Sequence, residues 1–275
     1  MDEGVEEMSC ALQKMLLTGA YSDLTIHCGE KSWAVHKVLL CSRSDYFKAA
    51  CRPDAFKEGH DACINLVATT DEGHEDDLSA DNPEAVELMI DLIYRHNYTA
   101  PHIHISVASA NGGGGHSNNR AVPWLTPSGD CNVVMHAKMY ALGSKYGIKS
   151  LQDVAKIKFS EAACYAWNDR RFVDAIQVVY TTTPDEDKGL RDITTRTIHE
   201  HCAQLVRKPR VAVCMHSING LAFDLLVRQT TPEVVRLPPL CSGCLKESTA
   251  YCPRCNCLVK AKATDDDDEG GDGGW

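Results

Sequence analysis

The sequence lacks the features that would connect it to a membrane or to nucleic acid. No apolar run comes near the ~20 residues that a helix needs to cross a bilayer, and no long Lys/Arg cluster appears. The 38 acidic residues outnumber the 28 basic ones, which gives a formal net charge of -10. Because phosphate neutralisation needs a basic face, we expect no nucleic-acid partner and no anionic membrane surface.

The N-terminus does not have the pattern of a secretory signal. Residues 1–7 read MDEGVEE, which is acidic where a signal peptide is basic and then apolar. The chain nevertheless has 14 cysteines, and nine of them are scattered through apolar-patterned segments, where reduced cysteine behaves as a small hydrophobe. We therefore expect free or metal-bound thiols and a location in the nucleus, the cytoplasm or both. The nine are Cys10, Cys28, Cys41, Cys51, Cys63, Cys131, Cys164, Cys202 and Cys214.

The other five cysteines cluster near the C-terminus, and four have the spacing of a zinc site. Cys241-Ser-Gly-Cys244 is followed, after seven residues, by Cys252-Pro-Arg-Cys255. Each pair forms a tight turn that aims two sulfurs at one point, and four thiolates close a tetrahedral Zn²⁺ sphere. A closed sphere leaves no place for water, so the predicted metal is structural. The alternative is a set of free thiols, and Cys257 either replaces Cys255 or stays free.

Hydrophobic periodicity predicts a small sheet flanked by helices. The expected elements are a helix over 5–20, a hairpin over 22–36, a helical stretch over 37–51 and a strand over 63–67. Asn82 and Pro83 are typical of the N-cap and first residue of a further helix. Its predicted buried stripe is Val86, Met89, Ile90 and Ile93.

The second half of the chain is predicted to be helical. One helix begins at Val133, with Val134, Ala137, Ala141 and Leu142 on its buried face, and stops at Gly147. Ser150 is the expected N-cap of the next helix. Further helices carry Phe172, Ile176 and Val179, then run over residues 190–206 with Cys202 inward, and continue over 210–236.

Several motifs in this order resemble the BTB/POZ domain. They are Tyr21–Ile26 (YSDLTI), Ala34–Phe47 (AVHKVLLCSRSDYF), Phe56–Glu58 (FKE), Leu88–Tyr98 and Lys138–Ile148 (KMYALGSKYGI). Together they cover about residues 20–160, and the extended layout resembles BTB proteins of filamentous fungi.

The resemblance implies an α+β BTB/POZ fold, a short sheet with flanking helices, followed by an all-α extension and a zinc module. The expected divisions are a 1–19 extension, a 20–160 BTB/POZ domain with flexible insertions at 69–82 and 99–131, and a 161–236 helical extension. A 237–262 zinc module and a 263–275 acidic tail complete the chain.

The resemblance also implies protein–protein association rather than an enzyme. Family members commonly form homodimers, and many bridge a substrate to a cullin-type ubiquitin ligase scaffold. The alternative is a nuclear transcription-regulatory or scaffolding protein. No motif with a positioned acid, base or nucleophile appears in the sequence.

Two pairs of residues are candidate contacts for partners. Asp23 and His36 lie on adjacent strands, and the resemblance implies a small polar pocket at the dimer groove; the alternative is fold support through hydrogen bonds. Phe56 and Glu58 resemble the apolar-x-Glu element that ligase adaptors place on the scaffold, where Phe would fill a pocket and Glu would pair with a basic group. The same triplet also occurs in members without that role.

Overall fold

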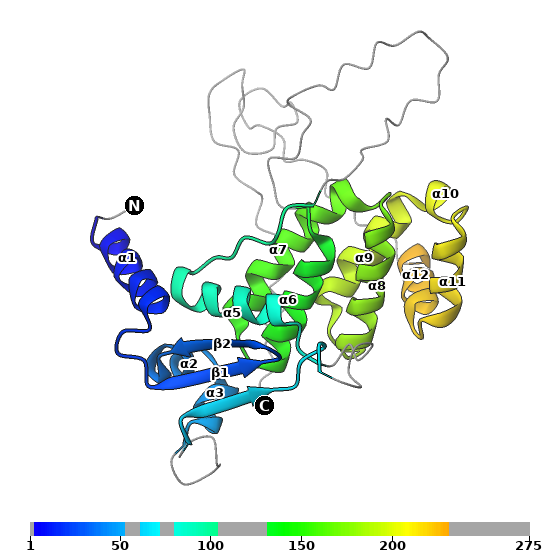
Figure 1. Cartoon of the computed structure of the whole chain (residues 1–275). Helices are drawn as coiled ribbons and strands as arrows, with labels where there is room; N and C mark the ends of the chain where they lie inside the picture. Colours follow the sequence, from blue (N-terminus) through cyan, green and yellow to red (C-terminus); the bar gives the residue numbers. More distant parts are fainter. Residues whose placement is uncertain (1–2, 53–60, 72–79, 104–130, 231–275) are drawn as a thin grey trace, which may run out of the picture. The chain divides into compact units, whose positions relative to one another are not determined.

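A computed structural model describes residues 3–52, 61–71, 80–103 and 131–230 (Figure 1). Its first part is a small sheet with helices around it, as predicted from the sequence. In chain order, the elements are α1 (Glu3–Thr18), β1 (Leu24–Cys28), β2 (Lys31–Val35), α2 (Lys37–Arg43), α3 (Asp45–Ala50), β3 (Cys63–Leu66) and α5 (Pro83–Arg95).

The sheet has the strand order β2-β1-β3. β1 and β2 form the predicted antiparallel hairpin, and Leu24 pairs with Val35. β3 adds to the other edge of β1 in parallel, so that Ile26 lies opposite Ile64. Alternate side chains of β1 are buried, which follows from the period-two pattern of the sequence.

Helix α5 confirms the most detailed of the sequence predictions. The Asn82 side chain caps the helix by accepting a hydrogen bond from Ala85 N, and Pro83 occupies its first position. All four residues of the predicted stripe are buried, and the helix is one of the main core elements. The local signals suffice here because the cap and the stripe both lie within one helix.

The rest of the described chain is helical (Figure 1). α6 contacts α7 and α8, α7 contacts α9, and α9 contacts α12. The helices are α6 (Val133–Lys145), α7 (Lys149–Ala166), α8 (Arg170–Thr182), α9 (Lys188–Glu200), α10 (Cys202–Leu205), α11 (Pro209–Ser217) and α12 (Leu221–Thr230).

Several details of these helices were predicted wrongly. α6 is buried on nearly all sides, because both α7 and α8 pack against it. Val134 and Ala141, which were assigned to its buried face, are only partly buried. α7 begins at Lys149 after the N-cap Ile148, so Ser150 is not the cap. Gly147 does follow α6 with a φ of 63°, as its C′ assignment requires.

The predicted long helices of the C-terminal half are each divided in two. His201 separates α9 from α10, and residues 218–220 separate α11 from α12. Gly220 has a φ of 86°, which glycine adopts without steric cost and which ends a helical run. The predicted helix over 210–236 extends beyond the described residues after Thr230.

The cysteine prediction is confirmed in part. Cys28, Cys131 and Cys214 are buried as small hydrophobes, and burial raises the pKa of the Cys28 thiol to about 11. Cys10, Cys164 and Cys202 are instead exposed. Cys202 was expected to face inward, but the break at His201 changes the helical phase there.

The predicted domain boundaries remain predictions. Residues Met1–Thr230 form one compact unit, and α7 runs through residue 160. In the described part of the chain, no single helix is long and apolar enough to cross a bilayer. α11 and α12 pass that test only as a pair, with a bend of 99° between them.

Candidate interaction site

Asp23 is an exposed residue that joins the hairpin to the start of α2. Its Oδ1 accepts a hydrogen bond from Lys37 N at 2.7 Å. Lys37 is the first residue of α2, and the N-cap residue His36 makes no capping bond with its own side chain. Asp23 therefore satisfies a helix N-terminal amide from fourteen residues away, which holds residues 20–23 against α2.

His36 is buried and makes two hydrogen bonds with its ring. Nε2 lies 2.8 Å from Ala20 O, and Nδ1 lies 2.6 Å from the Tyr94 hydroxyl. Because a carbonyl only accepts, Nε2 carries a proton and donates to Ala20 O, and Nδ1 shares the second hydrogen bond with the Tyr94 hydroxyl. The Tyr94 hydroxyl also accepts from His36 N at 2.9 Å. Burial raises the pKa of Tyr94 to about 12, so its hydroxyl keeps its proton at neutral pH.

Both residues thus have the hydrogen bonds expected for fold support, and they lie together at the junction of α1, β1 and α2. Their assignment to a dimer groove remains a prediction. The sequence analysis singled out this pair but not Tyr94, which is 58 residues from His36 in the chain.

Three exposed apolar side chains come from the segments that meet at this junction. Tyr21 is 88% exposed, Leu17 76% and Val38 73%. Tyr21 follows Ala20, whose carbonyl binds His36, and Val38 follows Lys37, whose amide binds Asp23. We call Leu17, Tyr21 and Val38 the junction patch.

Tyr21 also has an unusual backbone conformation. Its φ is 64°, in the left-handed region that a bulky residue rarely adopts. Such a conformation lowers the stability of the fold by about 1 kcal/mol. Because the ring is exposed, its contacts within the chain offset little of this cost. A strained, exposed aromatic residue is more typical of a binding contact than of a folding contact.

The remaining predicted site residues lie outside the described part of the chain. These are Phe56 and Glu58, and the four cysteines Cys241, Cys244, Cys252 and Cys255. Within the described ranges, no group of three His, Cys, Asp or Glu side chains is arranged to hold a metal ion.

The sequence reading missed a buried polar cluster around Asp81. Asp81 is only 2% exposed, although it falls within the predicted flexible insertion 69–82. Its carboxylate accepts from the Tyr146 hydroxyl at 2.6 Å and from Lys145 Nζ at 2.9 Å. Burial, followed by the Asp81 charge, raises the pKa of Tyr146 far above its usual range. The Asp81 backbone pairs with Val67 and Thr69, so the chain re-enters the core at this point.

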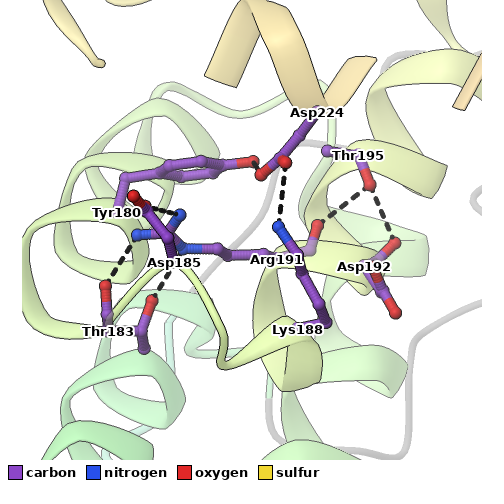
Figure 2. Close-up of polar contacts among 8 residues, drawn as sticks. All are labelled: Tyr180, Thr183, Asp185, Lys188, Arg191, Asp192, Thr195 and Asp224. Atoms are coloured by element: carbon purple, nitrogen blue, oxygen red, sulfur yellow. Dashed lines mark hydrogen bonds and ion pairs between the residues drawn. The ribbon is translucent and has the colours of Figure 1, made fainter. Parts of the chain in front are cut away.

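A second missed cluster surrounds Arg191, which is 3% exposed (Figure 2). Its guanidinium donates to the hydroxyl and carbonyl of Thr183 and to Asp185, and lies 4.6 Å from the Tyr180 ring centroid. Tyr180 and Lys188 each donate to Asp224 at 3.0 Å. These contacts connect α8, α9 and α12, and no local pattern in the sequence indicated them.

Comparison with known proteins identifies the first part of the chain. Residues 12–108 match the family model of the BTB/POZ domain. The match assigns a BTB/POZ domain to residues 12–108 alone, which are less than half of the chain. No match to a curated protein was found. Among solved structures, the BTB domain of zebrafish PATZ1 is similar at 13% sequence identity and a TM-score of 0.34, covering 57% of this chain and 92% of that one.

The match agrees with the observed small sheet and flanking helices, which a helical region follows. BTB/POZ domains are generally modules for protein–protein interaction or dimerisation rather than enzymes. The matched range includes Asp23, His36 and all three residues of the junction patch, Leu17, Tyr21 and Val38.

Proposed function

We propose that this protein is a non-enzymatic interaction module that forms a homodimer through the junction patch. The observation that carries the proposal is Tyr21, an aromatic residue held at a φ of 64° with 88% of its surface exposed. Two-fold homodimers are the commonest closed assemblies, and exposed aromatic side chains are enriched where proteins meet. Leu17 on α1 and Val38 on α2 are further exposed apolar residues of the segments that flank Tyr21 in the chain.

Substitution at Tyr21 separates association from folding. Asn tolerates the left-handed backbone and has no aromatic surface, so Tyr21→Asn is expected to leave the free energy of unfolding unchanged or raised. We expect it to weaken self-association about thirty-fold, the effect of losing a strong interface contact. Analytical ultracentrifugation over a concentration series measures this change.

The matched control is Ile157→Asn, because Ile157 is 61% exposed on α7, which contributes no residue to the patch. It should leave self-association at the wild-type value. Equal dissociation constants for wild type and Tyr21→Asn would reject the patch as the dimer surface.

We further propose that the protein is a substrate adaptor for a cullin-type ubiquitin ligase. The support is the resemblance of Phe56-Lys57-Glu58 to the adaptor element, in which Glu58 would pair with a basic group on the scaffold. Because that scaffold is intracellular, this role places the protein in the nucleus, the cytoplasm or both.

Affinity purification with mass spectrometry tests the adaptor role. We expect a cullin to co-purify with the wild-type protein. Glu58→Lys should reduce the amount of recovered cullin about ten-fold, because it would place a positive charge against the basic group of the scaffold. Tyr21→Asn, measured in parallel, shows whether the loss depends on the dimer. A stable set of partners without a cullin would favour the alternative of a nuclear transcription-regulatory or scaffolding protein.

We also propose that Cys241, Cys244, Cys252 and Cys255 hold a structural Zn²⁺. The support is their paired C-x-x-C spacing. Purified protein should contain about one zinc per chain by plasma mass spectrometry, and Cys241→Ser should lose most of it. Cys164→Ser, which changes an exposed cysteine in α7, is the control and should keep its metal. Zinc retained in the absence of Cys241 would contradict this ligand set.

A further inference from the structure

A cavity of about 640 Å³ lies between three helices of the compact unit. The N-terminal end of α5 forms one wall with Asn82 and Ala85, and the C-terminal end of α8 forms another with Val178 and Thr181. One face of α6 forms the third wall. This volume is within the usual range for a pocket that encloses a small organic molecule.

The α6 face combines positive charge with apolar surface. Lys138, Leu142 and Lys145 follow one another at intervals of four and three residues, so their side chains lie along one face of the helix. Ala141 and Leu142 from α6, with Ala85 and Val178 opposite, supply an apolar floor. Such a lining suits a molecule with both a charged group and an apolar body.

The two lysines differ in how their charges are balanced. Lys145 forms an ion pair with Asp81, whose other carboxylate oxygen accepts from Tyr146. Lys138, in contrast, has no carboxylate within ion-pair distance among the described residues. The described ionisable residues that line the cavity are these two lysines and Asp81, which leaves one net positive charge.

Lys138 is held in a partly desolvated position. Burial lowers the pKa of its ammonium group, and Glu84 at the start of α5 only partly opposes this effect. A charged lysine kept beside a cavity without an ion pair costs stability, and perturbed groups of this kind are concentrated in binding sites. The positive end of the α5 helix dipole, at the same wall, also favours an anion.

We propose that this cavity binds a small organic monoanion, a carboxylate with an apolar body, whose charged group is bound by Lys138. The carboxylate accepts hydrogen bonds from Lys138 Nζ, and the apolar body packs on Ala141, Leu142 and Val178. The one net positive charge among the described lining residues matches a monoanion better than a dianion. This binding function is independent of self-association through the junction patch.

Titration of the full chain with hexanoate and with benzoate tests the proposal by saturation-transfer NMR. Both probes should bind wild type, whereas acetate, without an apolar body, and 1-hexanol, without a charge, should bind at least about ten-fold more weakly. Lys138→Met removes the charge while keeping most of the length of the side chain. It should weaken hexanoate binding about ten-fold. The melting temperature of Lys138→Met should equal or exceed that of wild type, because a desolvated charge is removed.

Lys156→Met is the matched control, since Lys156 is an exposed residue of α7 outside the cavity, and its hexanoate affinity should equal that of wild type. Absence of binding by both probes, or equal binding to wild type and Lys138→Met, would overturn the proposal. A variant in which Glu72, Glu75, Asp76 and Asp77 become amides examines the acidic segment next to the lining residue Ala80. Hexanoate binding to that variant alone would assign the site to the chain's own carboxylates and would equally overturn the proposal.

Discussion

Asp81→Ala is expected to lower the free energy of unfolding by about 3 kcal/mol, because it removes a charged acceptor from a buried site. Asp81 is 2% exposed, and its two oxygens bind the Tyr146 hydroxyl at 2.6 Å and Lys145 Nζ at 2.9 Å. Without the carboxylate, the buried Tyr146 hydroxyl loses its acceptor. Lys145 is 43% exposed and regains water, so most of the loss comes from Tyr146. Urea denaturation measures the change.

A double-mutant cycle isolates the contact between these two residues. Tyr146→Phe is expected to cost about 1.5 kcal/mol, and adding it to Asp81→Ala should cost clearly less than the two single losses together. Asp153→Ala is the control, because Asp153 is 58% exposed and pairs with an exposed lysine, Lys149. That change should stay within about 0.5 kcal/mol. A similarly small effect of Asp81→Ala would mean that the cluster does not stabilise the fold.

Arg191→Ala is expected to lower the free energy of unfolding by about 3 kcal/mol, because it removes the donor of buried hydrogen bonds in the helical region. The guanidinium donates to the Thr183 carbonyl at 2.6 Å and to its hydroxyl at 3.1 Å, and both acceptors lie in the interior (Figure 2). Its contact with the Tyr180 ring and the packing of its stem are lost as well. Asp185 contributes little to this loss, because it is 85% exposed and returns to water.

The geometry of the guanidinium matters as much as its charge. Arg191→Lys keeps the charge but loses the planar fork whose three nitrogens donate separately to the Thr183 hydroxyl, the Thr183 carbonyl and Asp185, so we expect it to retain most of the destabilisation. Arg196→Ala is the control on the same helix, because Arg196 is exposed, and it should change stability by about 0.5 kcal/mol or less. Full recovery of stability by Arg191→Lys would show that charge alone accounts for the role of Arg191.

The sequence was most reliable where all the necessary information lies within one element. The hairpin was predicted because alternation and a Gly-Glu turn define it locally, and α5 because its cap and its stripe do so. The limits of these local signals appear at residues 190–206. That pattern is helical throughout, yet the chain breaks at His201, whose ring stacks on Trp167 with centroids 3.8 Å apart. A contact across 34 residues has no local signature.

The candidate sites divide in the same way. The sequence indicated Asp23 and His36 through a resemblance, but their partners Lys37 and Tyr94 became evident only when the chain was folded. Asp81 appeared to be one acidic residue of a polar loop, because composition describes a segment and not the burial of a single carboxylate. Tyr21 appeared within a familiar motif, and its left-handed backbone could not be inferred from that motif.

The sequence by itself indicated a BTB/POZ domain through a resemblance of its motifs, and the family match supports this over residues 12–108. It also determined the hairpin, the start and buried face of α5, and the helical character of the second half. These follow from the spacing of residues within single elements, where each helix or strand turns its apolar side chains to one face. Only the tertiary structure decided which polar groups meet in the interior and where a cavity remains. Burial and hydrogen bonding between Asp81 and Tyr146, or around Arg191, depend on residues brought together by packing rather than by sequence.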